Sequence, residues 1–393
     1  MQYLIKLISL LIKTEIKFGN PKKSALVIYD DTSIKDFKNV LRGRDYFIMQ
    51  TRAEKINKIF FSWKILLLVI KNYRNNLLTS YLVSLLNIME TKLVITTIDN
   101  CFKFSEIAKI LHKRITFIAV QNAARYDFDR NRLLFKLKRA DHDDNKKFFI
   151  PNYYCFGQYE VKNCKKNNIK AINFYKAGSL RLSNYLHYLR EKKIKIIKNK
   201  YDVALISEAS LYKDKLWSME EIDKSFGKLA KFAIIFCKKH KLRFVFVTKR
   251  EKGIHQEKEL KFYENNLDKN EFNFLIKNAM RVNREKYQSY KTIHESNIIV
   301  GMCSTLLRDK LTLRGKILAC NFTPLNFYDF PISGVCLMKN YSYNHFEKKM
   351  LENLKMSNKK YFSLIRGSKL IKLNKKNLTF QIINRHIDQI IQR

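Results

Sequence analysis

The chain has 393 residues, of which 46% are hydrophobic and 13% aromatic. It is too long for one ordinary core and too apolar to be intrinsically disordered. The net charge of +42 favours anionic partners, either polyanions or anionic lipid surfaces. The lysines are spread over the whole sequence, however, whereas a dedicated nucleic-acid-binding protein usually concentrates them on one face. Charge alone therefore does not select a function.

Seven cysteines form no CxxC pair, and several lie within apolar runs, which is typical of buried thiols in a reducing compartment. We therefore expect a cytoplasmic protein. No stretch of 18 uncharged apolar residues is present, so no membrane-spanning helix is expected. Residues 3–12 form a short apolar segment beside basic residues. They are interpreted either as an amphipathic helix resting on the inner membrane face or as an ordinary packing helix.

In the first half of the chain, apolar runs of strand length alternate with helical patterns, as in parallel βαβ units. The predicted strands are residues 25–29, 45–50, 93–98, 115–120, 153–157 and 172–175. The predicted helices are residues 60–73, 77–90, 104–111 and 180–189. The charge-dense residues 126–147 are predicted to be a surface loop, and the lysine-rich residues 191–200 a linker.

The second half restarts the same alternation. The predicted strands are residues 202–206, 243–247, 297–300, 316–320 and 335–338. The predicted helices are residues 219–241, 305–313, 344–354 and 378–391, with Ser218 and Glu221 as a capping box for the first. His255 is placed in a polar loop. We expect an N-terminal domain of residues 1–190, a C-terminal domain of residues 191–374, and a final helix within residues 375–393 that packs back on the N-terminal domain.

Polar residues follow several predicted strands, at the sheet edge where ligands bind in open α/β folds. They are Asp30, Asp31, Asp99, Asn100, Gln121, Asn122, Lys249, Arg250 and Glu208. Glu208 has no assigned role.

The sharpest local feature is the junction of residues 298–309, where a strand runs through Gly301 and small hydroxyl residues into a helix. Such a junction presents free backbone N–H groups and the positive end of a helix dipole, which suits a phosphate. Arg308, one turn into the helix, adds a charge-assisted contact to the same anion. The alternative is that Ser304 only caps the helix and that Arg308 is a surface side chain.

The segments 304–309, 314–318 and 321–323 resemble the donor-site segment of GT-B glycosyltransferases, in particular of bacterial surface-carbohydrate biosynthesis proteins. The resemblance implies an α/β fold of two Rossmann-like domains facing a central cleft. It implies that Ser304 and Thr305 meet the donor phosphates and that Asp309 holds the ribose, although the gap from Asp309 to Gly315 is a residue longer than usual. On the acceptor side, the matching residues are Asn100, Gln121, Asn122, Ala123 and Arg125, with Ala123 in place of the common glycine.

The implied reaction is attack of an acceptor hydroxyl on the anomeric carbon of a nucleotide-sugar, with loss of the nucleotide diphosphate. The helix start at Ser304, Arg308 and the pair Lys249–Arg250 would supply positive charge without a metal. Asp99 is the candidate general base; the alternative is that it caps the helix beginning near Phe102. Asp30 and Asp31 are the next candidates. The histidines show no zinc-ligand spacing, no P-loop or nucleophile elbow occurs, and no cofactor is expected beyond the donor.

The sequence thus predicts a glycosyltransferase that moves a sugar onto a surface glycan or a lipid-linked acceptor of capsule or lipopolysaccharide, peripheral to an anionic inner membrane face. Two alternatives remain open. One is a nucleic-acid-binding protein, for which no usual module is found. The other is a catalytically silent GT-B scaffold for polysaccharide assembly.

Overall fold

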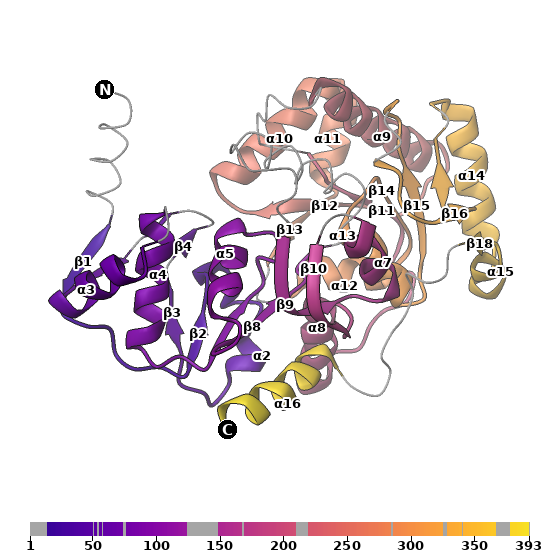
Figure 1. The fold of residues 1–393 in the computed structure, drawn as a ribbon. Coiled ribbons are helices and arrows are strands. Elements are labelled where there is room, and N and C mark those ends of the chain that lie inside the picture. The colour runs from indigo at the N-terminus through magenta and orange to yellow at the C-terminus, as the bar shows by residue number, and fades with distance from the viewer. Residues whose placement is uncertain are drawn as a thin grey trace. The chain divides into compact units, whose positions relative to one another are not determined.

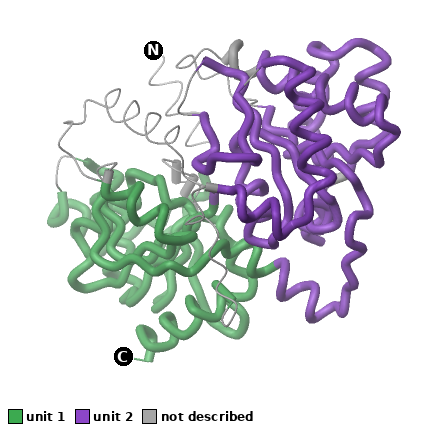
Figure 2. The backbone as a smooth tube through the Cα atoms, turned by 90° about the vertical axis from the view of Figure 1, so that its right-hand side faces the viewer, with its two compact units in different colours: residues 1–122, 133–184, 374–393 green, residues 123–132, 185–373 purple. Residues whose placement is uncertain are grey.

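The computed structural model describes the following residues: 14–49, 51–52, 55–56, 58–73, 76–123, 148–166, 169–209, 219–283, 286–324, 328–339, 341–366 and 378–392. The apolar segment 3–12, Arg125, the loop predicted at residues 126–147 and Ser218 lie outside these residues. The chain forms two compact units, shown in Figure 2. Unit 1 comprises residues 1–122, 133–184 and 374–393, and unit 2 comprises residues 123–132 and 185–373.

Unit 1 is built on a six-stranded parallel sheet (Figure 1). Its strands are β2 (Leu26–Ile28), β3 (Phe47–Ile48), β7 (Leu93–Thr96), β8 (Thr116–Val120), β9 (Phe148–Cys155) and β10 (Ile169–Lys176). They lie in the order β10-β9-β8-β7-β2-β3. The chain therefore changes direction across the sheet between β2 and β7, which is the switch point where ligands bind in such sheets.

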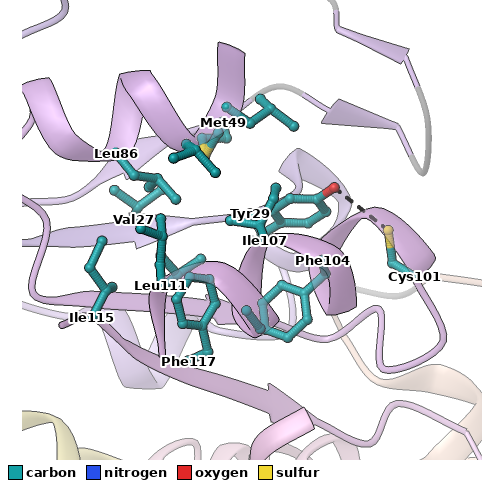
Figure 3. Packing of buried hydrophobic residues seen from close by; sticks show 14 of the residues in the cluster. Val27, Tyr29, Met49, Leu86, Cys101, Phe104, Ile107, Leu111, Ile115 and Phe117 are labelled. Carbon is teal, nitrogen blue, oxygen red and sulfur yellow. Dashed lines mark hydrogen bonds between the residues drawn. The ribbon is translucent and has the colours of Figure 1, made fainter. Parts of the chain in front are cut away.

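Helices cover both faces of this sheet, because alternate residues of its buried strands point to opposite sides. On one face, Val27 and Phe117 pack against Leu86, Phe104 and other residues of the cluster in Figure 3. The described helices of unit 1 are η1 (Asp31–Ser33), α2 (Lys38–Leu41), α3 (Trp63–Lys71), α4 (Leu77–Ile88), α5 (Phe102–Leu111), α7 (Gln158–Lys166), α8 (Leu180–Glu191) and α16 (Thr379–Ile391). The C-terminal part of α8, from Tyr185 onward, is assigned to unit 2.

The C-terminal helix α16 belongs to unit 1, although it follows unit 2 in the sequence (Figure 2). Its residues Ile383 and Ile387 are fully buried in the same cluster as Ile28 and Ile95 of the sheet. The Thr379 hydroxyl at its start donates to the Ala177 carbonyl at 2.7 Å. This burial attaches the end of the chain to the sheet of unit 1.

Unit 2 is built on a second parallel sheet of six strands. Its strands are β11 (Tyr201–Ile206), β12 (Phe244–Glu251), β13 (Ala279–Val282), β14 (Ser296–Gly301), β15 (Lys316–Cys320) and β17 (Leu337–Met338). The order β13-β12-β11-β14-β15-β17 is that of a dinucleotide-binding Rossmann fold. Its switch point lies between β11 and β14.

The helices of unit 2 are α9 (Met219–Lys239), α10 (Ile254–Asn266), α11 (Lys269–Lys277), α12 (Gln288–Glu295), α13 (Thr305–Thr312), α14 (Tyr343–Lys355) and α15 (Asn358–Ser363). On one face of the sheet, Phe236 of α9 and Phe346 of α14 pack against Leu205 and Val300. Among the described helices of the chain, none is long and apolar enough to cross a membrane.

The predicted α/β fold with two Rossmann-like halves is confirmed, but two local predictions are wrong. His255 lies in helix α10 and not in a loop. Helix α10 was not predicted because its sequence is polar: one of its two buried residues is Glu259, so the apolar helical pattern is missing. Residues 58–61 form strand β6 (Lys58–Phe61), paired with β1 (Glu15–Phe18), and the helix begins only after Ser62, whose hydroxyl caps it.

Three two-stranded pairs complete the described strands. They are β1 with β6, β4 (Thr51–Arg52) with β5 (Lys55–Ile56), and β16 (Ser333–Gly334) with β18 (Ile365–Arg366).

Candidate functional site

The switch point of unit 2 is closed by a carboxylate. Glu208 follows β11, and its oxygens accept hydrogen bonds from the backbone N–H of Met302 at 2.7 Å and of Cys303 at 2.9 Å. Both donors lie directly after β14, so the carboxylate bridges the two strands at which the chain reverses direction. Gly301 makes this possible, because a Cβ at that position would lie 2.7 Å from Glu208 Oε1. The glycine therefore provides space for a carboxylate of the protein itself.

Glu208 is buried, and burial raises the pKa of its carboxyl above the ordinary value. The hydrogen bonds from Cys303 and Met302 and the charge of Lys249 act in the opposite direction. The Met302 and Cys303 N–H groups of this junction thus already have an acceptor within the protein. The phosphate contacts predicted from the sequence, Ser304 and Thr305, come directly after these two residues and stay a prediction.

The start of helix α13 is more accessible than the strand before it. Ser304 caps the helix by accepting from the Leu306 N–H at 3.3 Å, and Ser304 and Thr305 are half-buried, whereas Gly301 and Met302 are buried. The cap interpretation of Ser304 therefore holds, without excluding an anion at the same helix end.

The two ionic residues predicted on α13 are both buried. Arg308 is 2% exposed, so it is not a surface side chain. Asp309 is 1% exposed and accepts a hydrogen bond from the Tyr290 hydroxyl of α12 at 3.0 Å. The carboxyl of Asp309 therefore contacts the interior of unit 2.

The end of β12 carries the predicted cationic pair. The backbone N–H groups of Lys249 and Arg250 donate to the two carboxylate oxygens of Glu259, at 2.7 and 3.0 Å. Glu259 is fully buried on α10, and burial raises the pKa of its carboxyl. Lys249 is exposed and its charge acts on both Glu208 and Glu259. Arg250 is half-buried, and its Nε is buried without a hydrogen-bond partner. Glu259 thus fixes the backbone of two cationic residues at this edge of unit 2.

Sequence reasoning missed the residues that hold this edge in place. The Tyr263 hydroxyl donates to Ser207 Oγ at 3.1 Å, next to Glu208. Glu259 and Tyr263 lie four residues apart on α10 and are its only buried residues. That i, i+4 spacing was a usable signal for a buried helix face. Glu208 was visible as an acid directly after a predicted strand.

The Gly315–Lys316 pair of the resembling segment has a structural role. A Cβ at Gly315 would lie 2.0 Å from Lys310 Cε, so the glycine leaves room for that buried side chain. Lys310 Nζ donates to the carbonyls of Ile293 and Ser296, and burial lowers its pKa to about 7. Lys316 Nζ donates to three carbonyls at the end of α14, those of Asn353, Leu354 and Met356.

The switch point of unit 1 also carries a buried acid. Asp30 follows β2 and is fully buried, and its Oδ1 accepts from the Thr32 N–H at 2.7 Å and from the Thr32 hydroxyl. Its Oδ2 is buried without a hydrogen-bond partner, as is Asp31 Oδ1. Burial raises the pKa of Asp30, the bonds from Thr32 oppose the rise, and the neighbouring Asp31 adds to it. The Ser33 hydroxyl, 2.9 Å from Thr97 Oγ1, joins this turn to the end of β7.

Asp99 lies beyond β7 and is 4% exposed. Its Oδ2 accepts a hydrogen bond from the Tyr153 hydroxyl at 2.7 Å. The N-cap position of α5 is Cys101, whose own side chain makes no cap bond. Asp99 and Asp30 follow the two strands that flank the same switch point, β7 and β2.

The remaining acceptor-side residues have different surroundings. Gln121 is buried, and its Oε1 accepts from the Phe156 N–H at 3.0 Å, which joins the ends of β8 and β9. Asn100 is exposed and Asn122 is half-buried. Within the described residue ranges, no group of three or more His, Cys, Asp or Glu is arranged to hold a metal ion.

No family model matches this sequence, and no curated protein matches it. The structure is similar to UDP-GlcNAc 2-epimerase of Methanocaldococcus jannaschii, solved in complex with UDP-GlcNAc and UDP. The TM-score is 0.52 at 11% identity, covering 95% of this chain and 99% of that chain. It also matches the trehalose-6-phosphate synthase OtsA (TM-score 0.45, 10% identity, 97% and 99% covered). A further match is the wall teichoic acid polymerase TagF (TM-score 0.41, 11% identity, 96% and 89% covered).

The two parallel sheets and the first of these similarities define a GT-B-type α/β fold with two Rossmann-like units. At this level of identity the likeness concerns the fold.

Proposed function

We propose that the protein is a glycosyltransferase that uses a nucleotide-activated sugar. One observation carries the proposal: at the switch-point edge of unit 2, Lys249 and Arg250 lie at the end of β12, and β14 leads into the accessible start of α13. Phosphates bind at such helix starts, and cationic side chains strengthen the contact. The similar epimerase structure contains UDP-GlcNAc and UDP, which supports a nucleotide-sugar as the ligand.

In this proposal the donor diphosphate meets Ser304 and Thr305 at the helix start, together with Lys249 and Arg250. Arg250 offers a buried Nε that has no partner within the protein. Gly301 and Glu208 shape the loop before the helix. Because Arg308 and Asp309 are buried, we assign Arg308 a supporting charge beneath the helix start and leave the ribose contact of Asp309 unassigned.

The reaction forms a bond between an acceptor oxygen and the anomeric carbon and breaks the bond between that carbon and the diphosphate oxygen. The nucleotide diphosphate leaves with the electron pair, and the acceptor proton passes to a carboxylate. We favour Asp30 as that base, since its Oδ2 has no hydrogen-bond partner within the protein. Asp99, which already accepts from Tyr153, is the second candidate. Asp30 is buried, so the role requires the turn at residues 30–37 to admit the acceptor hydroxyl.

For the acceptor we propose a glycan or a lipid-linked saccharide of a surface polymer such as capsule or lipopolysaccharide, bound beside Asn100 and Asn122. Gln121 would position this edge through its bond to Phe156. Such an acceptor places the enzyme at the cytoplasmic face of an anionic membrane. The charge of +42 supports this location.

A second candidate is a GT-B scaffold without catalytic activity, and a specific observation favours it. The carboxyl of Glu208 occupies two N–H groups that a phosphate would otherwise use. A scaffold would keep the fold and lack nucleotide binding.

A thermal-shift screen against UDP-, GDP-, CDP- and dTDP-sugars at two salt concentrations separates these functions, because a ligand of the native state raises the melting temperature. The transferase predicts a salt-tolerant shift with sugars of one nucleotide. No shift with any of them would favour the scaffold. A shift only with a random RNA oligomer, lost at high salt, would favour nucleic-acid binding.

A further inference from the structure

Unit 1 exposes a group of large apolar side chains where a surface is ordinarily polar. The α3 face is defined here by Phe18, Phe61, Trp63, Leu67 and Ile70, which are 85%, 49%, 77%, 65% and 66% exposed. These residues lie on β1, β6 and α3. Strand β6 pairs with β1 and contacts α3, and β1 and α3 are labelled in Figure 1. Ile16, Tyr73 and Leu77 nearby are also at least 49% exposed. Apolar patches of this kind on a folded protein mark interaction sites.

Helix α3 is apolar on both sides, and each side has a different environment. Ile65 and Val69 are buried in the core of unit 1. At about 100° per residue, Trp63, Leu67 and Ile70 fall within an arc of about 60° on the exposed side. Lys64 and Lys71 follow along one edge of that arc, where their long side chains can reach past apolar surroundings. The exposed side therefore has the pattern of a helix lying in a membrane interface.

Ring packing and hydrogen bonds hold the strands of the α3 face in place. The aromatic rings of Phe18 and Phe61 pack edge to face, with centroids 6.3 Å apart. Next to them, the Tyr81 hydroxyl bonds to both backbone groups of Phe60, at 2.7 and 3.1 Å. These contacts anchor β1 and β6, the strands that carry Phe18 and Phe61.

The charge around the α3 face is positive. Strands β1 and β6 and helix α3 carry four lysines and one acid, Glu15, a net charge of +3. Glu15 pairs with Lys17 and Lys58 at 3.4 and 3.2 Å. Lys64 and Lys71 are exposed beside the apolar arc. A second copy of the chain on this face would bring these like charges together, whereas an anionic bilayer complements them.

We propose that the α3 face docks the protein on an anionic lipid bilayer, with Trp63, Leu67 and Ile70 inserted at the interface and Lys64 and Lys71 at the headgroups. This gives the membrane location of the proposed function a specific surface. It does not depend on sugar transfer, because vesicle binding is measured without a donor or an acceptor.

The test is cosedimentation of the full chain with vesicles of phosphatidylcholine alone or of equal parts phosphatidylcholine and phosphatidylglycerol. We expect binding to the anionic vesicles. The variant Leu67→Glu/Ile70→Glu should bind these vesicles at least about tenfold more weakly, since it removes two inserted side chains and adds negative charge. Lys64→Gln/Lys71→Gln should weaken binding about fivefold per lysine, on anionic vesicles only.

The matched control is Ile172→Glu/Ile254→Glu, which changes two apolar residues that are 57% and 63% exposed elsewhere. It should retain most of the binding. Equal losses in the control and in the α3 variant would overturn the proposal, as would no vesicle binding by the wild type. A dimer in sedimentation velocity that Leu67→Glu/Ile70→Glu dissolves, with vesicle binding intact, would assign the face to a second copy. Nucleotide affinity on the same variants should be unchanged, and its absence in the wild type would contradict only the transferase.

Discussion

The switch points of the two sheets both hold a buried acid two residues after a strand, but the two acids have different surroundings. In unit 2, Glu208 accepts from the Met302 and Cys303 N–H groups with both of its oxygens engaged. In unit 1, Asp30 is held by Thr32 through one oxygen, while the other is buried without a partner. Burial raises the pKa of both carboxyls.

Glu208 stabilises a loop through its hydrogen bonds, whereas Asp30 has a buried oxygen without a partner, which lowers the stability of the fold. A buried polar atom with no hydrogen bond costs about 1–3 kcal/mol, and such atoms call for an explanation such as a catalytic role. Glu208 shapes the β14–α13 junction, whereas Asp30 retains capacity for another hydrogen bond. The chemistry we propose therefore places proton transfer in unit 1 and donor binding in unit 2.

The largest expected effect concerns turnover. If Asp30 accepts the acceptor proton, Asp30→Asn should lower kcat by about 10²–10⁴-fold with little change in donor affinity. Exposed Asp45→Asn is the control and should retain activity. Initial rates of nucleotide diphosphate release measure both. A larger loss in Asp99→Asn than in Asp30→Asn would transfer the role to Asp99.

Removing the partnered acid should destabilise the fold. Glu208→Ala leaves two buried N–H groups without acceptors and opens a cavity, so we expect a loss of about 3 kcal/mol in the free energy of unfolding. Glu264→Ala removes only an exposed pair with Lys261 and should change it by less than about 0.5 kcal/mol. Urea unfolding followed by circular dichroism gives both values. Similar stability in the two variants would mean that Glu208 does not hold the junction.

Replacing Asp30, whose Oδ2 has no hydrogen-bond partner, should change the free energy of unfolding in the opposite direction. Asp30 has a folded pKa above its ordinary 3.8, so the folded state binds the extra proton and stability falls as pH rises from 3.8 through the raised pKa. Asp30→Asn removes this dependence and should gain about 1–2 kcal/mol at pH 8. The measurement is the free energy of unfolding of wild type and variant from pH 4 to 8. Parallel curves would show that Asp30 does not titrate in this way.

The smallest expected effect tests the support of Asp99. Tyr153→Phe removes the hydroxyl that donates to Asp99 Oδ2 and should cost about 1 kcal/mol of stability. Tyr73→Phe, at a residue that is 59% exposed, should cost nothing measurable. Thermal unfolding compares the two. An unchanged Tyr153→Phe variant would mean that the hydrogen bond contributes nothing to stability.

Sequence reasoning succeeded where periodicity decides the structure. Buried parallel strands contain continuous apolar runs, such as residues 93–95 and 317–320, so they were found, together with the polar residues that follow them. It failed for α10, where a buried glutamate replaces an apolar residue in the helical pattern.

It also failed where a partner is distant in sequence. Nothing local to residues 301–305 shows that a carboxylate 94 positions earlier accepts from the Met302 N–H. The burial of Arg308 and Asp309 likewise depends on tertiary packing. The residues of a strand end could therefore be predicted, and which of their polar groups are already occupied could not.

The central claim is that the edge of unit 2 binds the diphosphate of a nucleotide-sugar. Isothermal titration of the donor identified in the screen into wild type and Lys249→Ala/Arg250→Ala tests it most directly, with exposed Lys252→Ala/Lys258→Ala as the control. We expect the control to bind the donor with wild-type affinity. The Lys249→Ala/Arg250→Ala variant should bind it at least about tenfold more weakly, because it loses charge-assisted contacts. Equal affinity in all three proteins would contradict the placement of the donor.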